Sequence, residues 1–141
     1  MFRRLRPAFF VLFALAAVGA ASIVSRSGGA TDRIQWRHDL AAARAEAATS
    51  HKPVLALFSA RWCGFCDQMR KTTWSDSRVE TAMQDFVPVK IDIDEHQPLA
   101  IQYQVHGLPG YAVLDENGNV LKRGEGWQEP GEFLSWLGKS H

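Results

Sequence analysis

The feature that most constrains this sequence is the stretch at residues 58–67, which contains its only two cysteines, Cys63 and Cys66. An apolar run at residues 53–58 leads into it, and residues 67–71 tolerate or favour a helix. This order predicts a buried strand, a short turn and a helix that begins at the cysteines. Unpaired N–H groups and the helix dipole stabilise a thiolate at a helix N-terminus, and a residue three positions later returns to the same face. We therefore hypothesise that Cys63 is an exposed nucleophile, that Cys66 is the resolving thiol, and that the pair exchanges disulfides.

Two other uses of a cysteine pair have to be weighed. A structural bridge across two intervening residues restrains the unfolded chain very little, which favours a chemical use. A copper-binding module remains an alternative, with Cys63, Cys66 and His106 as ligands, because thiolates and imidazole suit Cu(I). Structural zinc is not predicted, since no second Cys/His pair has ligand spacing. Asp67 follows Cys66 where a c-type haem site would need histidine.

The first 25 residues predict a secretory signal peptide or a membrane anchor. Three arginines precede an uncharged run of 19 residues at positions 7–25. The basic end should stay in the cytoplasm, so both possibilities place the rest of the chain in the periplasm or another extracytoplasmic compartment, either secreted or anchored to the inner membrane. Residues 26–31 predict a linker, which leaves residues 32–141 as one folded domain.

The net charge of +1 conceals an uneven distribution. Four of the 16 basic residues precede Asp32, the first acidic residue, so 12 remain against 15 acidic residues. The predicted domain therefore carries about −3, and it lacks the basic surface that nucleic-acid binding requires. We expect no nucleic-acid partner.

The remaining pattern predicts alternating helices and strands. A helix is expected from Thr31 or Asp32 to about residue 51, with His38 and His51 on the surface. After the cysteine-containing helix, the pattern predicts a helix at residues 78–84, a strand at 86–94, a helix at 96–104, strands at 111–114 and 120–123 joined by an Asn117-Gly118 hairpin, and a final helix from residue 129. This order is that of an α/β sandwich.

Residues 32–139 resemble the thioredoxin superfamily. The resemblance rests on four features: residues 62–66 (Trp-Cys-Gly-Phe-Cys) after a strand, residues 89–92 (Val-Lys-Ile-Asp), the Gly-Leu-Pro loop at residues 107–109, and the closing hairpin and helix. The flanking residues are most similar to exported members such as the C-terminal domain of the membrane reductase DsbD. The resemblance implies the thioredoxin fold, a three-layer α/β/α sandwich with a central mixed sheet, preceded here by the N-terminal signal or anchor helix.

The resemblance also implies a function and a site. It implies a protein thiol–disulfide oxidoreductase, more often reducing, in which Cys63 matches the nucleophile and Cys66 the resolving cysteine. The implied partners are protein thiol or disulfide substrates and a membrane or soluble thiol electron donor or acceptor, and no cofactor is implied beyond the redox-active disulfide. Pro109 matches a proline that is cis in this family and faces the disulfide. The implied substrate-binding and supporting residues are Trp62, Gly64, Phe65, Leu108 and Pro109.

Two positions depart from the family pattern. Leu57 occupies the place of a buried aspartate that is thought to move the proton of the resolving cysteine, so Lys90 lacks its usual acidic partner. Proton transfer must then use water or another group, with Glu80 and Asp67 as candidates. Gly110 stands where thioredoxins usually have threonine, and we expect it to leave the substrate groove more open.

Overall fold

The computed structural model describes residues 30–138. The predicted signal or anchor segment at residues 1–25, and residues 26–29 of the predicted linker at 26–31, lie outside the described residues. No helix within residues 30–138 combines the length and the apolar character needed to cross a membrane.

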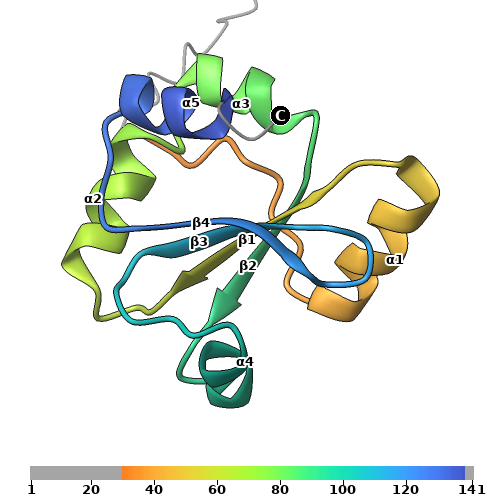
Figure 1. Cartoon of the computed structure of the whole chain (residues 1–141). Coiled ribbons are helices and arrows are strands. Elements are labelled where there is room, and N and C mark those ends of the chain that lie inside the picture. Colours follow the sequence, from red (N-terminus) through yellow and green to blue (C-terminus); the bar gives the residue numbers. More distant parts are fainter. Residues whose placement is uncertain (1–29, 139–141) are drawn as a thin grey trace, which may run out of the picture.

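A four-stranded mixed sheet lies at the centre of the fold, in the order β2-β1-β3-β4 (Figure 1). The strands are β1 (Val54–Ser59), β2 (Val87–Asp92), β3 (Gly110–Leu114) and β4 (Val120–Glu125). β1 pairs in parallel with β2 and antiparallel with β3, and β3 pairs antiparallel with β4. All six residues of β1 are buried, as expected of a central strand that is covered on both faces.

Helices cover both faces of the sheet. Above it in Figure 1 lie α3 (Ser77–Met83) and α5 (Pro130–Gly138), with α2 (Gly64–Thr72) beside them. Their apolar side chains form one core with alternate β1 residues Leu55 and Leu57. On the other face, α1 (Leu40–Ser50) and the residues around α4 (Gln97–Gln102) form a second core with Val54, Ala56 and Phe58. The predicted three-layer sandwich is confirmed.

The first helix begins later than the sequence pattern predicts, which corrects the expected start at Thr31 or Asp32. α1 starts at Leu40, where the Asp39 side chain accepts a hydrogen bond from the backbone N–H of Ala42. Residues 32–38, here called the strap, are not helical, and Arg37 in the strap pairs with the free edge of β2. The Arg37 N–H donates to Pro88 O (2.9 Å), and the Lys90 N–H donates to Arg37 O (2.8 Å). These edge hydrogen bonds satisfy backbone groups that a sheet edge would otherwise leave unpaired, and so compete successfully with helix formation.

Candidate active site

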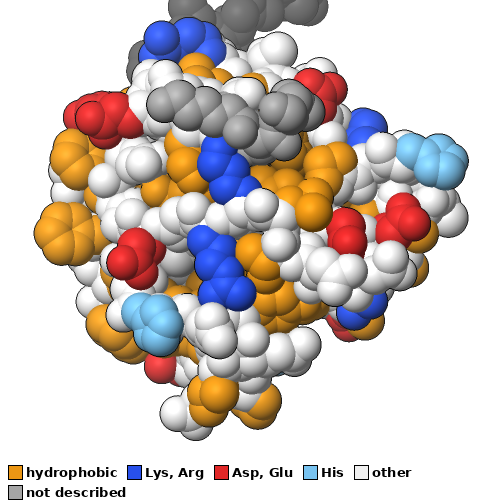
Figure 2. Space-filling view, viewed as in Figure 1, with side chains coloured by type: hydrophobic (Ala, Val, Ile, Leu, Met, Phe, Trp, Pro, Cys, Tyr) orange, Lys and Arg blue, Asp and Glu red, His pale blue; other side chains and the backbone are white. Residues whose placement is uncertain are grey.

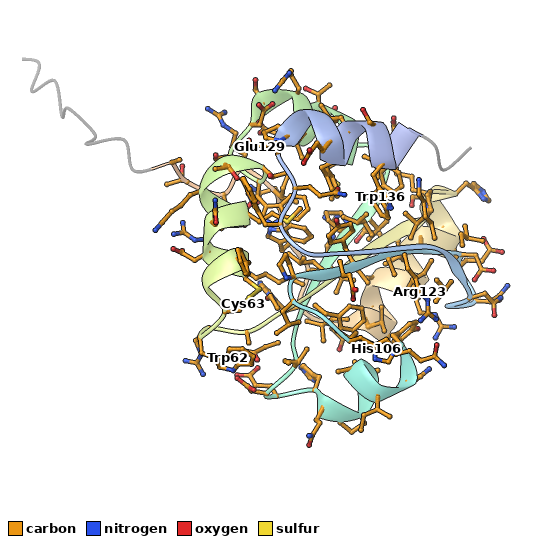
Figure 3. The ribbon with its side chains drawn as sticks, turned by 60° about the vertical axis from the view of Figure 1, so that its left-hand side comes forward. Trp62, Cys63, His106, Arg123, Glu129 and Trp136 are labelled. Carbon is orange, nitrogen blue, oxygen red and sulfur yellow. A yellow bond between two sulfur atoms is a disulfide. The ribbon has the colours of Figure 1, made fainter. Side chains whose placement is uncertain are left out.

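The two cysteines lie at the beginning of α2, directly after β1 and its short turn (Figure 3). They form a disulfide, and their Cα atoms are 5.2 Å apart. Cys63 is the N-cap residue of α2, and its Sγ accepts a hydrogen bond from the backbone N–H of Cys66 (3.1 Å). In the reduced protein, this N–H and the helix dipole favour the thiolate of Cys63 over that of Cys66.

The exposure of the two cysteines differs from the prediction. Cys63 exposes only 7% of its surface in the disulfide form, whereas Cys66 is of intermediate exposure. The expectation of an exposed Cys63 is therefore wrong for the oxidised state. The N-cap hydrogen bond turns its sulfur toward the N-terminus of α2. Pro109, which is also buried, lines the cavity that the two cysteines line.

The loop before β3 brings a proline to the disulfide. The Leu108–Pro109 peptide bond is cis, as the resemblance implied. Pro109 lines the same cavity as Cys63 and Cys66, and its carbonyl accepts a hydrogen bond from the Gly126 N–H at the end of β4 (2.8 Å). This hydrogen bond ties the proline loop to the rigid sheet.

Gly110 does not open the groove, which corrects a second expectation. It is buried, and a Cβ added there would lie 3.0 Å from Gly107 O and 3.1 Å from Val105 Cγ1. The preceding loop therefore already fills the space that a larger side chain would occupy.

Two large apolar side chains flank the disulfide at the surface. Trp62 exposes 69% and Phe65 exposes 62% of its surface. The indole N–H of Trp62 donates to Asp94 Oδ2 (3.0 Å), which fixes the ring beside the disulfide (Figure 3). Hydrophobic side chains are exposed along the left-hand edge of the face in Figure 2, where α2 lies. Such an exposed apolar surface is typical of a protein–protein contact site.

A cavity of about 410 Å³ adjoins the disulfide, and both cysteines line it. Leu57 lines it from the sheet and brings no ionisable group, while its register partner Lys90, which is of intermediate exposure, lines the same cavity. Within the described residues the Lys90 side chain has no hydrogen bond or ion pair. From α2, Asp67 pairs with Arg70 (2.7 Å) and Lys71 (2.5 Å), and these hydrogen bonds hold the pKa of Asp67 below its ordinary value.

The structure brings to this region two residues that the sequence analysis did not assign to the site. His38, expected only as a surface residue, is exposed but also lines the cavity. Asp32 lies near Lys90 and Arg70. Burial raises the pKa of its carboxyl group, although hydrogen bonds from Ile34 N–H and Trp36 Nε1 and the two positive charges lower it in part. Both residues belong to the strap, which the sequence pattern assigned to the first helix, so neither was expected near the cysteines.

Two other candidates are separated from the cysteines. Glu80 forms an ion pair with Arg33 (3.4 Å) and lines a different cavity, so it does not adjoin the disulfide. His106 lies apart from Cys63 (Figure 3) and lines two grooves that contain neither cysteine. Among residues 30–138, no group of three His, Cys, Asp or Glu side chains is arranged to hold a metal ion. The copper site with His106 is therefore not supported.

Comparison with known proteins agrees with this geometry. Residues 35–116 match the sequence model of the thioredoxin-like family. The chain is 28% identical over 147 residues to the thiol:disulfide interchange protein DsbD of Actinobacillus pleuropneumoniae, a match that covers 94% of this chain and 25% of that protein. The chain thus spans about a quarter of the length of that relative. It is 37% identical over 90 residues to a thioredoxin-like protein of Synechocystis, covering 64% of this chain and 83% of that protein.

Solved structures give the same answer. The C-terminal domain of Neisseria meningitidis DsbD in its oxidised form superposes with a TM-score of 0.61 at 28% identity, covering 75% of this chain and 99% of that one. A thioredoxin from Thermus thermophilus superposes with a TM-score of 0.67 at 27% identity, covering 75% and 87%. Since the family model matches more than half of the chain and the cysteine pair is in place, this chain belongs to the thioredoxin-like family and is a thiol–disulfide oxidoreductase.

Proposed function

We propose that this chain reduces disulfide bonds in protein substrates outside the cytoplasm, with Cys63 as nucleophile and Cys66 as resolving cysteine. The observation that carries the proposal is the hydrogen bond from the Cys66 N–H to Cys63 Sγ at the N-terminus of α2. A thiolate at this position is the better nucleophile of the pair at neutral pH. The basic and then apolar N-terminal sequence supports a location in the periplasm or at the inner membrane.

The reaction proceeds in two exchanges. The Cys63 thiolate attacks a sulfur of the substrate disulfide, a mixed disulfide forms, and the other substrate sulfur leaves as a thiolate. The Cys66 thiolate then attacks Cys63 Sγ, the bond between Cys63 and the substrate breaks, and the second substrate sulfur leaves. Two electrons pass to the substrate, and the Cys63–Cys66 disulfide remains. No cofactor beyond this disulfide takes part.

The surface around the disulfide supports a protein as substrate. Trp62 and Phe65, each adjacent in sequence to one of the cysteines, offer exposed apolar contact area, and Pro109, which follows Leu108, lines the cavity beside the disulfide. Gly64 leaves the space before α2 open, because a Cβ added there would meet no atom within 4 Å. An extended segment of the substrate would lie across this surface with its backbone against the proline loop.

The direction of electron flow rests on the similarity to DsbD and to thioredoxins. A reductase of this kind must be reduced again after each turnover, so we propose a thiol partner, at the membrane or in solution, as electron donor. Titration of the full chain against glutathione or dithiothreitol buffers tests the direction. We expect a midpoint nearer to about −270 mV, the thioredoxin value, than to about −120 mV, the value for the oxidant DsbA. A midpoint at the DsbA end would overturn the reducing direction.

A trapping experiment tests the roles of the two cysteines. Cys66→Ala should accumulate a mixed disulfide, joined through Cys63, with a protein substrate that contains disulfide bonds, such as insulin. Cys63→Ala is the matched control, and it should accumulate far less. Preferential trapping through Cys66 would contradict the assignment.

A further inference from the structure

The resolving step needs a group that accepts the proton of Cys66. Cys66 must lose its proton before it can attack Cys63, and Leu57, which lines the same cavity from the sheet, cannot accept one. The cavity of about 410 Å³ beside the pair is large enough for water, so a proton acceptor on its wall could act through a water molecule.

The cavity wall offers few acceptors. Lysine and arginine side chains are protonated at neutral pH, which removes Lys90, Arg61 and Arg70. The carboxylate of Asp67 is held by two cations, and Asp92 Oδ1 accepts a hydrogen bond from the Asp94 N–H (2.9 Å). Glu95 also lines the cavity but is exposed, and a solvated carboxylate, unlike the buried aspartate that the family resemblance implies at position 57, is a weak base toward a thiol, whose ordinary pKa is about 8.5. An imidazole is a better match, because proton transfer is most efficient when the acceptor's pKa lies near the operating pH.

His38 is the one imidazole among the residues that line this cavity. His38 is the last residue of the strap, and the pairing of the strap with β2 places it at the cavity. Arg37 pairs in parallel with Val89 of β2, and its side chain forms an ion pair with Glu46 of α1. The next residue, His38, lies at the junction of the strap and α1, where it lines both the disulfide cavity, with Lys90, and a second cavity beside α1 and α4. Within the described residues the His38 side chain has no hydrogen bond or ion pair, so both of its ring nitrogens are available.

We propose that His38 accepts the proton of Cys66, through water in this cavity, in the step that releases the substrate. This proposal rests on the proposed function. The Cys66 S–H proton passes to a ring nitrogen of His38, and the thiolate left behind attacks Cys63 Sγ. The bond from Cys63 Sγ to the substrate sulfur breaks, and its electron pair leaves with that sulfur. The imidazolium then returns its proton to solvent, to which His38 is exposed.

Charged and titratable groups face His38 from every element packed against it. They are Lys90 and Asp92 on β2, Arg61, Asp67 and Arg70 around α2, Asp39 and Arg44 at α1, and Glu95 and His96 before α4. The test therefore compares variants across a pH range rather than at one pH.

Stopped-flow reaction of the reduced full chain with one equivalent of the aromatic disulfide DTNB separates the two steps. Attack by Cys63 releases the first thionitrobenzoate, and attack by Cys66 on the mixed disulfide releases the second. At pH 7 we expect His38→Gln to slow the second release about tenfold while the first stays within twofold, since general-base assistance is typically worth 10² or more when direct. The difference should vanish at about pH 9, where Cys66 ionises without help.

The matched control is His96→Gln, because His96 shares a second cavity with His38 but does not line the disulfide cavity. Both of its releases should match the native protein. Added imidazole should restore the second release in His38→Ala, which a purely structural role would not allow. An unchanged second release in His38→Gln, equal slowing of both releases, or a loss that persists at pH 9 would overturn the role of His38. Absence of both releases in the native chain would instead overturn the proposed function.

Discussion

Gly124 lies in β4 opposite Tyr111 of β3, at a point where the sheet leaves no room for a side chain. A Cβ built on Gly124 would lie 2.2 Å from Tyr111 Cε2 and 2.9 Å from Cδ2 and Cζ. Non-bonded carbon atoms approach to about 3.5 Å, so the ring would have to move by roughly 1 Å. The ring is only 2% exposed and meets Phe133 and Trp136 edge-on, with centroids 5.7 Å and 4.8 Å away, so this movement disturbs an aromatic cluster.

We therefore expect Gly124→Ala to lower the free energy of unfolding by about 2–3 kcal/mol, in the upper part of the range for overpacked cores. The measurement is urea unfolding of the oxidised protein at pH 7, read from the midpoint at constant m value. Gly131→Ala is the control, because a Cβ at Gly131 of α5 meets no atom within 4 Å and alanine favours a helix. It should be neutral or slightly stabilising.

The clash with the ring can be isolated by a double-mutant cycle. In a Tyr111→Ala background the obstacle is gone, so the further change Gly124→Ala should cost only a few tenths of a kcal/mol. A loss below about 1 kcal/mol in the native background, or an equal loss in both backgrounds, would refute the reasoning.

Three further changes test the electrostatic and packing arguments by urea unfolding at several pH values. Tyr111→Phe should raise the free energy of unfolding by about 1 kcal/mol, because the buried hydroxyl has no hydrogen-bond partner within the described residues. Burial raises the pKa of Tyr111 to about 12. The free energy of unfolding of the native protein should therefore fall between pH 10 and 12, where this tyrosine ionises more easily in the unfolded state, and Tyr111→Phe should lack this part of the fall. Asp76→Ala removes the N-cap of α3 and should cost about 1 kcal/mol at pH 7. The Arg78 hydrogen bond lowers the pKa of Asp76 to about 2, so this cost should shrink as the pH falls from 4 toward 2. Leu57→Asp should cost about 3 kcal/mol or more at pH 7, from lost apolar burial and a buried carboxylate, and less at pH 4, where the carboxyl is protonated. Equal stability curves for any variant and the native protein would contradict the corresponding argument.

Local patterns in the sequence were enough to predict the features around the cysteine pair. The strand, the turn with two cysteines and the helix behind them follow from an apolar run and a C-x-x-C spacing, and the structure confirms their order and their disulfide. The hairpin at Asn117-Gly118 is equally local, since Gly118 takes a positive φ of 84° that suits glycine. The resemblance carried the cis bond at Leu108–Pro109, which no local pattern would have distinguished from an ordinary turn.

The surroundings of the disulfide could not be predicted in the same way, because they depend on contacts between distant segments. The helical propensity of the strap is adequate, so its sequence predicts the first turns of a helix. The backbone hydrogen bonds of Arg37 to the edge of β2 and of Arg33 to Trp74 O explain why it is not helical. The same contacts place His38 at the cavity and Asp32 near Lys90, although both residues are distant from the cysteines in sequence. The burial of Cys63 likewise depends on packing across separate elements. Local patterns fix which residues form a strand or a helix, but the neighbours of a reactive group are set by contacts between segments whose spacing in the sequence carries no periodic signature.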